Sequence, residues 1–142
     1  MSLRFPVASV VALLGPAPVR ARICAALDEG SARCAGGHGN LRVARISAAP
    51  AESLHDRLDT IRATEARIVL VERITDGLSG AERRTALSAL EDLAGAGATV
   101  VVDDADPVAV LAVADVVLRA TPDGDVALEE LPDAQALQPL LS

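Results

Sequence analysis

Residues 67–84 read RIVLVERITDGLSGAERR, and this stretch decides the fold. Its first six residues form a β-rich apolar run ending in Glu72, which is typical of a strand buried on both faces of a parallel sheet. Further on, Ser79 and Glu82 have the S-x-x-E spacing of a capping box, which predicts that a helix begins there. An apolar stripe carries that helix to Gly95, through Leu87, Leu90 and Leu93. The stretch therefore predicts a strand, a turn and a helix.

The same alternation continues on both sides of this stretch. Further β-rich runs occupy residues 7–14, 41–46, 99–103 and 116–119, with a weaker one at 126–128. Helical patterns fall between most of these runs: one is opened by Pro18, one carries Leu54, Leu58 and Ile61, and a short one is started by the Asp106-Pro107 pair. This order predicts an α/β fold with an open, mostly parallel sheet and helices on both faces. We expect one domain over residues 1–128, followed by an acidic tail at 129–142.

The composition limits the classes of partner. Hydrophobic residues make up 51% of the chain and aromatic residues 1%, so Ala, Val, Leu and Ile must build the core. The formal net charge of -7, together with the scarcity of stacking rings, excludes nucleic acid as a partner. The apolar runs are too short to cross a bilayer, so we expect a cytoplasmic protein without membrane insertion. Cys24 and Cys34 are expected as reduced thiols, because two cysteines do not make a secreted disulfide scaffold.

Residues 67–84 resemble the Walker B strand, the D-loop and the following helix of ABC-type ATPases. The resemblance continues in order along the chain: residues 97–102 look like the strand before that family's switch histidine, 114–118 and 123–126 like its closing hairpin, and 11–16 like the strand leading into its Walker A loop. It implies a three-layer P-loop NTPase core of the ABC ATPase type. Only residues 41–65 lie where the family inserts its helical subdomain, so the resemblance implies a core without it.

A second register of the resemblance is open within the same stretch. Residues 78–83, LSGAER, also look like the family's LSGGQ signature, and Asp103 and Asp104 then take the Walker B position. This second register leaves little chain after the Walker B strand. The first register places the switch histidine at Ala105, which lies 33 residues after Glu72 and close to the family's spacing.

The residues that bind phosphate are missing from the Walker A position. Aligned on Gly15 and Pro16, the motif's lysine falls on Ala21, its Mg²⁺-binding hydroxyl on Arg22, and one of its glycines on Arg20. A phosphate loop needs the lysine against the β- and γ-phosphates and the hydroxyl on Mg²⁺. The resemblance therefore implies a degenerate nucleotide site that does not bind Mg-ATP tightly, and a protein without a cofactor.

The residues that hydrolyse ATP are missing as well. The Walker B acid is kept as Glu72, but Arg73 stands where the family positions its water-activating carboxylate. A guanidinium accepts no proton and cannot act as a general base. Ala105 stands at the position of the switch histidine. The resemblance thus implies an ATPase-like protein that is not an active enzyme.

The turn after this strand implies an interaction surface. In the resembled family its five residues lie at the dimer interface: Asp76, Gly77, Leu78, Ser79 and Gly80. We therefore expect a protein-interaction or regulatory subunit. The expected partner is a transporter permease, an ATPase subunit or a second copy of the chain, and such a partner would hold the chain at the cytoplasmic side of a membrane.

Two alternatives stay open at this point. The helix N-terminus after Gly15, with its flanking arginines, favours a pseudo-P-loop sensor that binds a nucleotide or a small anion without turnover. Asp103, Asp104 and Asp106 follow a strand at the expected carboxyl edge of the sheet, where α/β proteins bind ligands, and favour Mg²⁺-dependent chemistry. The simpler interpretation of these carboxylates is a helix cap at Asp106 and solvated loop residues.

Overall fold

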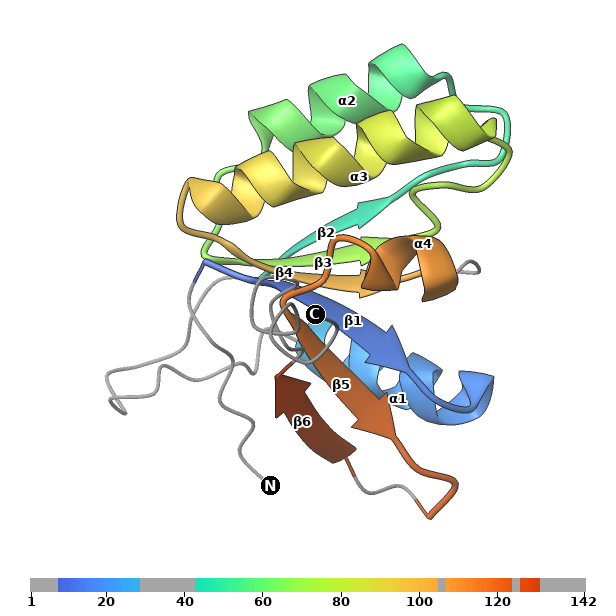
Figure 1. The fold of residues 1–142 in the computed structure, drawn as a ribbon, viewed down its shortest axis with the longest axis vertical. Helices are drawn as coiled ribbons and strands as arrows, with labels where there is room; N and C mark the ends of the chain where they lie inside the picture. Colours follow the sequence, from blue (N-terminus) through green and yellow to red (C-terminus); the bar gives the residue numbers. More distant parts are fainter. Residues whose placement is uncertain (1–7, 29–42, 105–106, 124–125, 131–142) are drawn as a thin grey trace, which may run out of the picture.

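The computed structural model describes residues 8–28, 43–104, 107–123 and 126–130, and strands and helices alternate along them (Figure 1). Their bounds are β1 Val10–Leu14, α1 Ala17–Asp28, β2 Val43–Ser47, α2 Leu54–Ala63, β3 Ile68–Glu72, α3 Gly80–Gly95, β4 Thr99–Asp103, α4 Pro107–Leu111, β5 Val116–Ala120 and β6 Val126–Glu130. Each β-rich run and each helical pattern of the sequence corresponds to one of these elements.

The strands of the described chain form one sheet in the order β2-β3-β4-β1-β5-β6. The first five run parallel, and β6 pairs antiparallel with β5. In this register Glu72, the last residue of β3, lies between Ser47 of β2 and Asp103 of β4. Parallel strands end at a common edge, so these polar side chains meet at the carboxyl edge of the sheet.

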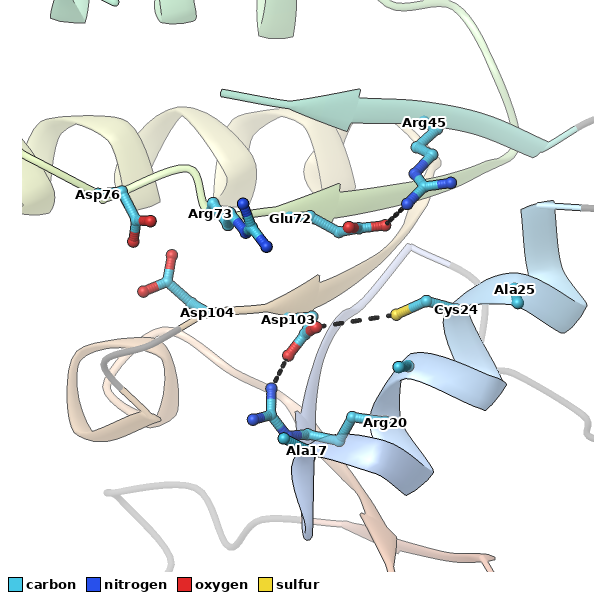
Figure 2. Close-up of a pocket in the computed structure, with 11 residues that line it drawn as sticks. Ala17, Arg20, Cys24, Ala25, Arg45, Glu72, Arg73, Asp76, Asp103 and Asp104 are labelled. Atoms are coloured by element: carbon cyan, nitrogen blue, oxygen red, sulfur yellow. Dashed lines mark hydrogen bonds and ion pairs between the residues drawn. The ribbon is translucent and has the colours of Figure 1, made fainter. Parts of the chain in front are cut away.

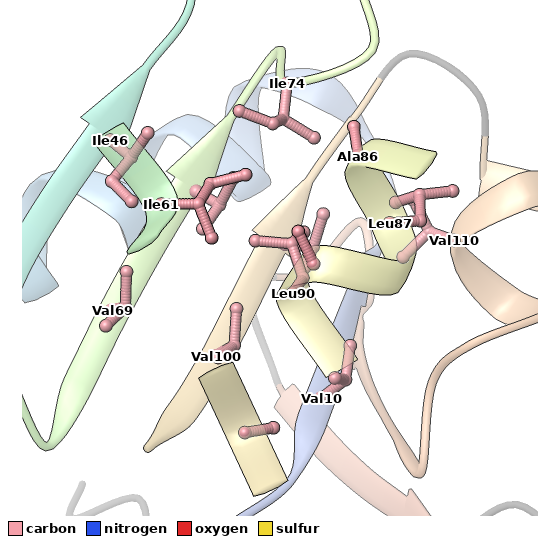
Figure 3. Close-up of a cluster of buried hydrophobic side chains, with 14 of the residues drawn as sticks. Val10, Ile46, Ile61, Val69, Ile74, Ala86, Leu87, Leu90, Val100 and Val110 are labelled. Atoms are coloured by element: carbon pink, nitrogen blue, oxygen red, sulfur yellow. The ribbon is translucent and has the colours of Figure 1, made fainter. Parts of the chain in front are cut away.

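Helices cover both faces of the sheet. Figure 1 shows α2, α3 and α4 on one face and α1 on the other. Successive side chains of β1 point to opposite faces: Val10 and Ala12 join the larger hydrophobic cluster under α2 to α4, whereas Val11 and Leu13 join the smaller cluster under α1. In the larger cluster, Leu90 of α3 lies over the strands (Figure 3). The predicted three-layer α/β architecture is confirmed.

The capping box that set the start of α3 is present. The Ser79 hydroxyl oxygen accepts a hydrogen bond from the Glu82 backbone N–H at 3.3 Å, and the Ser79 N–H donates to Oε1 of Glu82 at 3.1 Å. The helix ends at Gly95, as predicted. This fixes the direction in which the chain leaves the carboxyl edge after β3.

The boundaries differ from the sequence expectations by a few residues. α1 begins at Ala17, so Pro18 is its second residue rather than its first. β6 extends to Glu130, two residues beyond the β-rich run expected at 126–128. The expected cap Asp106, the expected switch position Ala105 and most of the acidic tail lie outside the described residues. No helix in the described ranges is long and apolar enough to cross a membrane.

Candidate functional site

A cavity of about 540 Å³ opens at the carboxyl edge of the sheet. α1 forms one wall, and the ends of β3 and β4 with the residues that follow them form the other (Figure 2). Seven of its lining residues are charged: Arg20, Arg45, Glu72, Arg73, Asp76, Asp103 and Asp104. Several of these were singled out from the sequence, and the fold brings them together from four separate segments.

An ion pair joins Arg45 of β2 to Glu72 of β3 across the cavity wall. The Arg45 Nη2 atom lies 2.7 Å from Oε1 of Glu72. The Glu72 side chain is 15% exposed, while that of Arg45 is 42% exposed. The carboxylate that the resemblance assigns to Walker B is therefore held by a guanidinium of the neighbouring strand.

A second ion pair joins α1 to β4. Nη1 of Arg20 contacts Oδ1 of Asp103, and Nε of Arg20 donates to the Gly15 carbonyl oxygen at 2.9 Å. The Cys24 thiol, one turn further along α1, donates to Oδ2 of Asp103 at 3.9 Å. Figure 2 shows Arg20 and Cys24 both directed from α1 toward this carboxylate. Arg20 thus neutralises a carboxylate of its own chain.

The cavity wall makes the Cys24 thiol a weak acid. Burial, followed by the carboxylates of Asp103 and Glu72, raises the pKa of Cys24 from 9.0 to about 12, against the opposing effect of Arg45 and Arg20. A thiol with so high a pKa stays protonated at neutral pH and is a poor nucleophile and metal ligand. Cys24 therefore serves as a small apolar residue with one weak hydrogen bond.

The connection between β1 and α1 consists of only Gly15 and Pro16. Gly15 has φ +126°, and a Cβ there would lie 2.3 Å from the Ala120 carbonyl oxygen, so the turn requires glycine. The Pro16 carbonyl accepts the N–H groups of Val19 and Arg20 at 3.0 Å each. Two backbone N–H groups of the first turn of α1 are therefore already hydrogen-bonded within the chain, at the place where a phosphate loop would present free N–H groups.

The remaining positions assigned to the Walker A motif lie on α1 itself. Ala21 lines the cavity, and Arg22 is exposed on the helix surface. Pro18 has no N–H to donate. The helix N-terminus that favoured an anion sensor thus offers few free donors, and Arg20, the arginine nearest to it, is engaged by Asp103.

Arg73 directly follows Glu72 and has an unusual backbone conformation. Its φ is +56°, in the left-handed region that non-glycine residues seldom adopt. Its N–H donates to the Asp103 carbonyl oxygen at 3.1 Å, which extends the β3–β4 ladder by one bond. The side chain lines the cavity (Figure 2). An arginine, rather than a carboxylate, therefore follows Glu72, the residue that the resemblance assigns to the Walker B acid.

The two consecutive aspartates at the end of β4 point apart. Asp103 faces α1, whereas Asp104, 7% exposed, accepts hydrogen bonds from the hydroxyl of Thr75 at 2.6 Å and from its N–H at 3.2 Å. Asp106 lies outside the described residues. Across the described ranges, no three His, Cys, Asp or Glu side chains are grouped as metal ligands. The arrangement gives Asp104 a role in fixing the turn after β3.

The turn expected as an interaction surface presents most of its residues outward. Gly77, Ser79 and Gly80 are exposed, and Asp76 is partly exposed. Leu78 is 7% exposed and belongs to the larger core cluster, so it anchors the turn instead of facing solvent. Four of the five residues are therefore available to a partner.

A buried arginine of α2 was not found from the sequence. Arg57 is 1% exposed, and all of its hydrogen-bond acceptors are backbone carbonyl oxygens. A signal was present, because Arg57 follows Leu54 by three residues and precedes Ile61 by four, which places it on the apolar face of the helix. An arginine on that face must have partners inside the protein.

Solved structures of similar fold include ATP-binding cassettes of ABC transporters. A nucleotide-free cassette from an ABC transporter matches with a TM-score of 0.63 and 9% identity, over 97% of this chain and 90% of that one. The dimeric structure of a bacterial ABC transporter cassette matches with a TM-score of 0.60 and 12% identity, over 92% and 89%. The structure of cbiO1 from Clostridium perfringens, part of the ABC transporter complex cbiONQ, matches with a TM-score of 0.60 and 11% identity, over 98% of this chain and 83% of that one.

No protein-family model matches the sequence, and no curated protein matches it significantly. At 9 to 12% identity the similarity to the cassettes is one of fold. The chain has the α/β fold of ABC ATPase cassettes, with five parallel strands. The resemblance read from the sequence is confirmed at that level.

Proposed function

We propose that this chain is a catalytically inactive, ABC-ATPase-like protein that acts by binding another protein. Its partner is a permease or an ATPase subunit of a membrane transporter, or a second copy of the chain. It works in the cytoplasm, at the membrane surface where a partner places it. The observation that carries this proposal is the state of the carboxyl edge, where arginine–carboxylate pairs and a two-residue connection stand in place of a phosphate site.

The cation chemistry of the chain supports the absence of tight ATP binding. The sequence contains no lysine, so all 13 of its Lys and Arg residues are arginine. No register of the resemblance can therefore supply the lysine that neutralises the β- and γ-phosphates in a P-loop. Two of the three cavity arginines, Arg20 and Arg45, already face carboxylates.

The absence of a base supports the loss of hydrolysis. Arg73 stands beside Glu72, and Glu72 is paired with Arg45. The Arg45 guanidinium lies 2.7 Å from Oε1 of Glu72 and so competes with a water molecule for that oxygen. We infer that the end of β3 lacks a group placed to activate water.

The surface that supports partner binding is the turn at residues 76–80. It is exposed at Gly77, Ser79 and Gly80 and is built on a capped helix. Loops held on a rigid scaffold are where binding residues concentrate.

Nucleotide turnover gives the first test. The purified chain is expected to release no phosphate from Mg-ATP above the buffer rate, and calorimetry with Mg-ATP or Mg-ADP is expected to give no heat of binding. Glu72→Gln should then behave as the wild type does. A phosphate-release rate that Glu72→Gln abolishes would contradict the proposal.

Partner binding is tested with two matched variants of α3. Gly80 and Gly95 lie at opposite ends of the helix, and a Cβ at either one meets nothing within 4 Å. Gly80→Arg should weaken association with a second copy or with a co-expressed cassette, while Gly95→Arg should not. Sedimentation velocity over a concentration series measures the effect. Equal behaviour of the two variants would place the interface elsewhere.

A further inference from the structure

Arg57 links two separate connections at the carboxyl edge. Its Nη1 donates to the carbonyl of Ile74 at 2.9 Å, in the connection between β3 and α3. Its Nε donates to the backbone carbonyl oxygen of Glu52 at 3.1 Å, and its Nη2 donates to those of Ala49 at 3.0 Å and Pro50 at 3.4 Å. All three acceptors lie in the connection between β2 and α2. One buried guanidinium therefore holds both segments.

The two connections also touch directly. Gly77 has φ +77°, and a Cβ there would lie 2.6 Å from the Pro50 carbonyl oxygen. Asp104 holds the same turn from the other side through the N–H and hydroxyl of Thr75. Ile74 and Leu78, which bracket this part of the turn, are buried in the core. The exposed residues 76–80 are thus fixed from beneath at several points.

The choice of an arginine is informative because it is not the residue that packs a helix most favourably. Burying a cation costs free energy unless hydrogen bonds compensate, and an apolar side chain of similar volume is often as stable or more so. The acceptors here are carbonyls of two loops rather than a carboxylate. Unlike an apolar residue, the guanidinium fixes the position of one loop relative to the other.

We propose that Arg57 is a positioning residue, which orders the turn at residues 76–80 into the conformation that a partner protein binds. The inference rests on the partner-binding function proposed above and adds the residue that prepares the surface. A surface ordered before binding loses less conformational entropy on association, so it binds more tightly than a mobile one. Arg57 contributes in this way without touching the partner.

Hydrogen exchange of the free chain tests the ordering directly and needs no partner. In Arg57→Met the amides of residues 75–80 should exchange about tenfold faster or more, because hydrogen bonds from a charged donor are lost. The amides of Val100 to Val102 in β4 should keep their wild-type rates. Arg62→Met is the matched control, since Arg62 lies exposed on the same helix and should leave all rates unchanged.

Two outcomes of this experiment would overturn the inference. Unchanged exchange at residues 75–80 would mean that Arg57 does not order the turn. Faster exchange across the whole chain would mean that it only stabilises the fold. If Arg57→Met does not fold, Arg57→Lys and Gly77→Ala provide milder changes to the same contacts, and both should loosen the turn locally.

Association measurements separate the inference from the function on which it rests. Arg57→Met should weaken binding of the partner that Gly80→Arg disrupts, by about tenfold, and Arg57→Lys should recover part of that loss. Full-strength binding despite a loosened turn would overturn the positioning role. If the wild type binds no second copy or cassette, the proposed function fails, while the exchange result still decides whether Arg57 orders the turn.

Discussion

The two faces of the sheet differ in how deeply they are buried and in how their arginines are partnered. Under α2 to α4 lies the larger core cluster, and its arginine, Arg57, is 1% exposed and bound to backbone carbonyls. Under α1 lies the smaller cluster, beside a cavity where Arg20 and Arg45 pair with carboxylates. The Arg20 side chain is 24% exposed and that of Arg45 is 42% exposed. The buried Arg57 holds backbone segments in place, whereas the ion pairs of Arg20 and Arg45 neutralise charges at a site that solvent reaches.

This difference shows where stability and binding potential are located. Partly exposed ion pairs are screened by water and contribute little to the free energy of folding. Deep apolar packing and buried hydrogen bonds contribute most of it. The α2 to α4 side should therefore dominate stability, and the α1 side should tolerate substitution. Five experiments probe the two sides.

The largest expected effect is on the Cys24 thiol, at the cavity under α1. Since its pKa is raised to about 12, mainly by burial, its thiolate fraction at pH 8 should be about a thousandfold below that of the unfolded chain. Alkylation by iodoacetamide, read on the Cys24 peptide by mass spectrometry, should be slowed accordingly. Equal rates in native and urea-unfolded protein would show that the α1 side is open.

The same pKa gives a pH dependence of stability. Above about pH 9 the unfolded thiol loses its proton while the folded thiol keeps it, so the unfolded state binds fewer protons. The contribution of Cys24 to the free energy of unfolding should therefore fall as the pH rises from 9 toward 12. Cys24→Ala should remove this part of the alkaline loss, as measured by urea unfolding at several pH values.

The second effect concerns core packing. Leu90→Ala, at a fully buried site of the α2 to α4 side, should lower the free energy of unfolding by about 2–5 kcal/mol. Ile23→Ala on α1, where the side chain is only partly buried, should cost about 1 kcal/mol. Urea denaturation of both variants provides the measurement. Comparable losses would mean that the two faces carry equal shares of stability.

The third effect is backbone strain beside α1. Gly15→Ala should cost about 1–3 kcal/mol, because its φ of +126° is unfavourable for alanine and the new methyl group meets Ala120. Gly80→Ala is the control, since it points into open space at the start of α3. Thermal and urea unfolding should leave that control close to wild type. A neutral Gly15→Ala would show that the connection can shift.

The smallest effect is that of the Arg20–Asp103 pair. A double-mutant cycle with Arg20→Ala and Asp103→Ala should give a coupling energy of up to about 1 kcal/mol, because both side chains are partly exposed. The coupling should shrink in about 1 M salt, where the screening length is short. A coupling of several kcal/mol that resists salt would make this pair part of the buried framework instead.

The fold was largely predictable from local patterns. Continuous apolar runs mark strands buried on both faces, and the capping box at Ser79 and Glu82 locates α3 to the residue. Strand order is not a local property, however. That β1 lies between β4 and β5 depends on pairings between residues 90 to 105 positions apart, such as Val10 with Val100 and Val11 with Val116, and the sequence predicted no strand order.

The sequence singled out some of the residues that line the cavity but not Arg45, and it predicted none of their pairings. Glu72, Arg73 and Asp103 could be placed at the carboxyl edge because each ends or follows a strand. The sequence suggested that Arg20 binds an anion, whereas in the fold Arg20 forms an ion pair with Asp103, 83 residues away. Arg57 was missed because its partners are carbonyls, which every residue has and which no motif records.

The two-residue connection after β1 has a consequence for any attempt to engineer ATP binding into this chain. A Walker A loop spans four residues between its glycines before its lysine, so it needs length as well as chemistry. Here the helix is already running at Ala17, and Gly15 is pressed against Ala120. Substituting lysine, glycine and serine into α1 would change side chains on a helix without forming a loop whose backbone N–H groups surround the phosphates. Only inserted residues, or an unwound first turn, would open the space that a triphosphate needs.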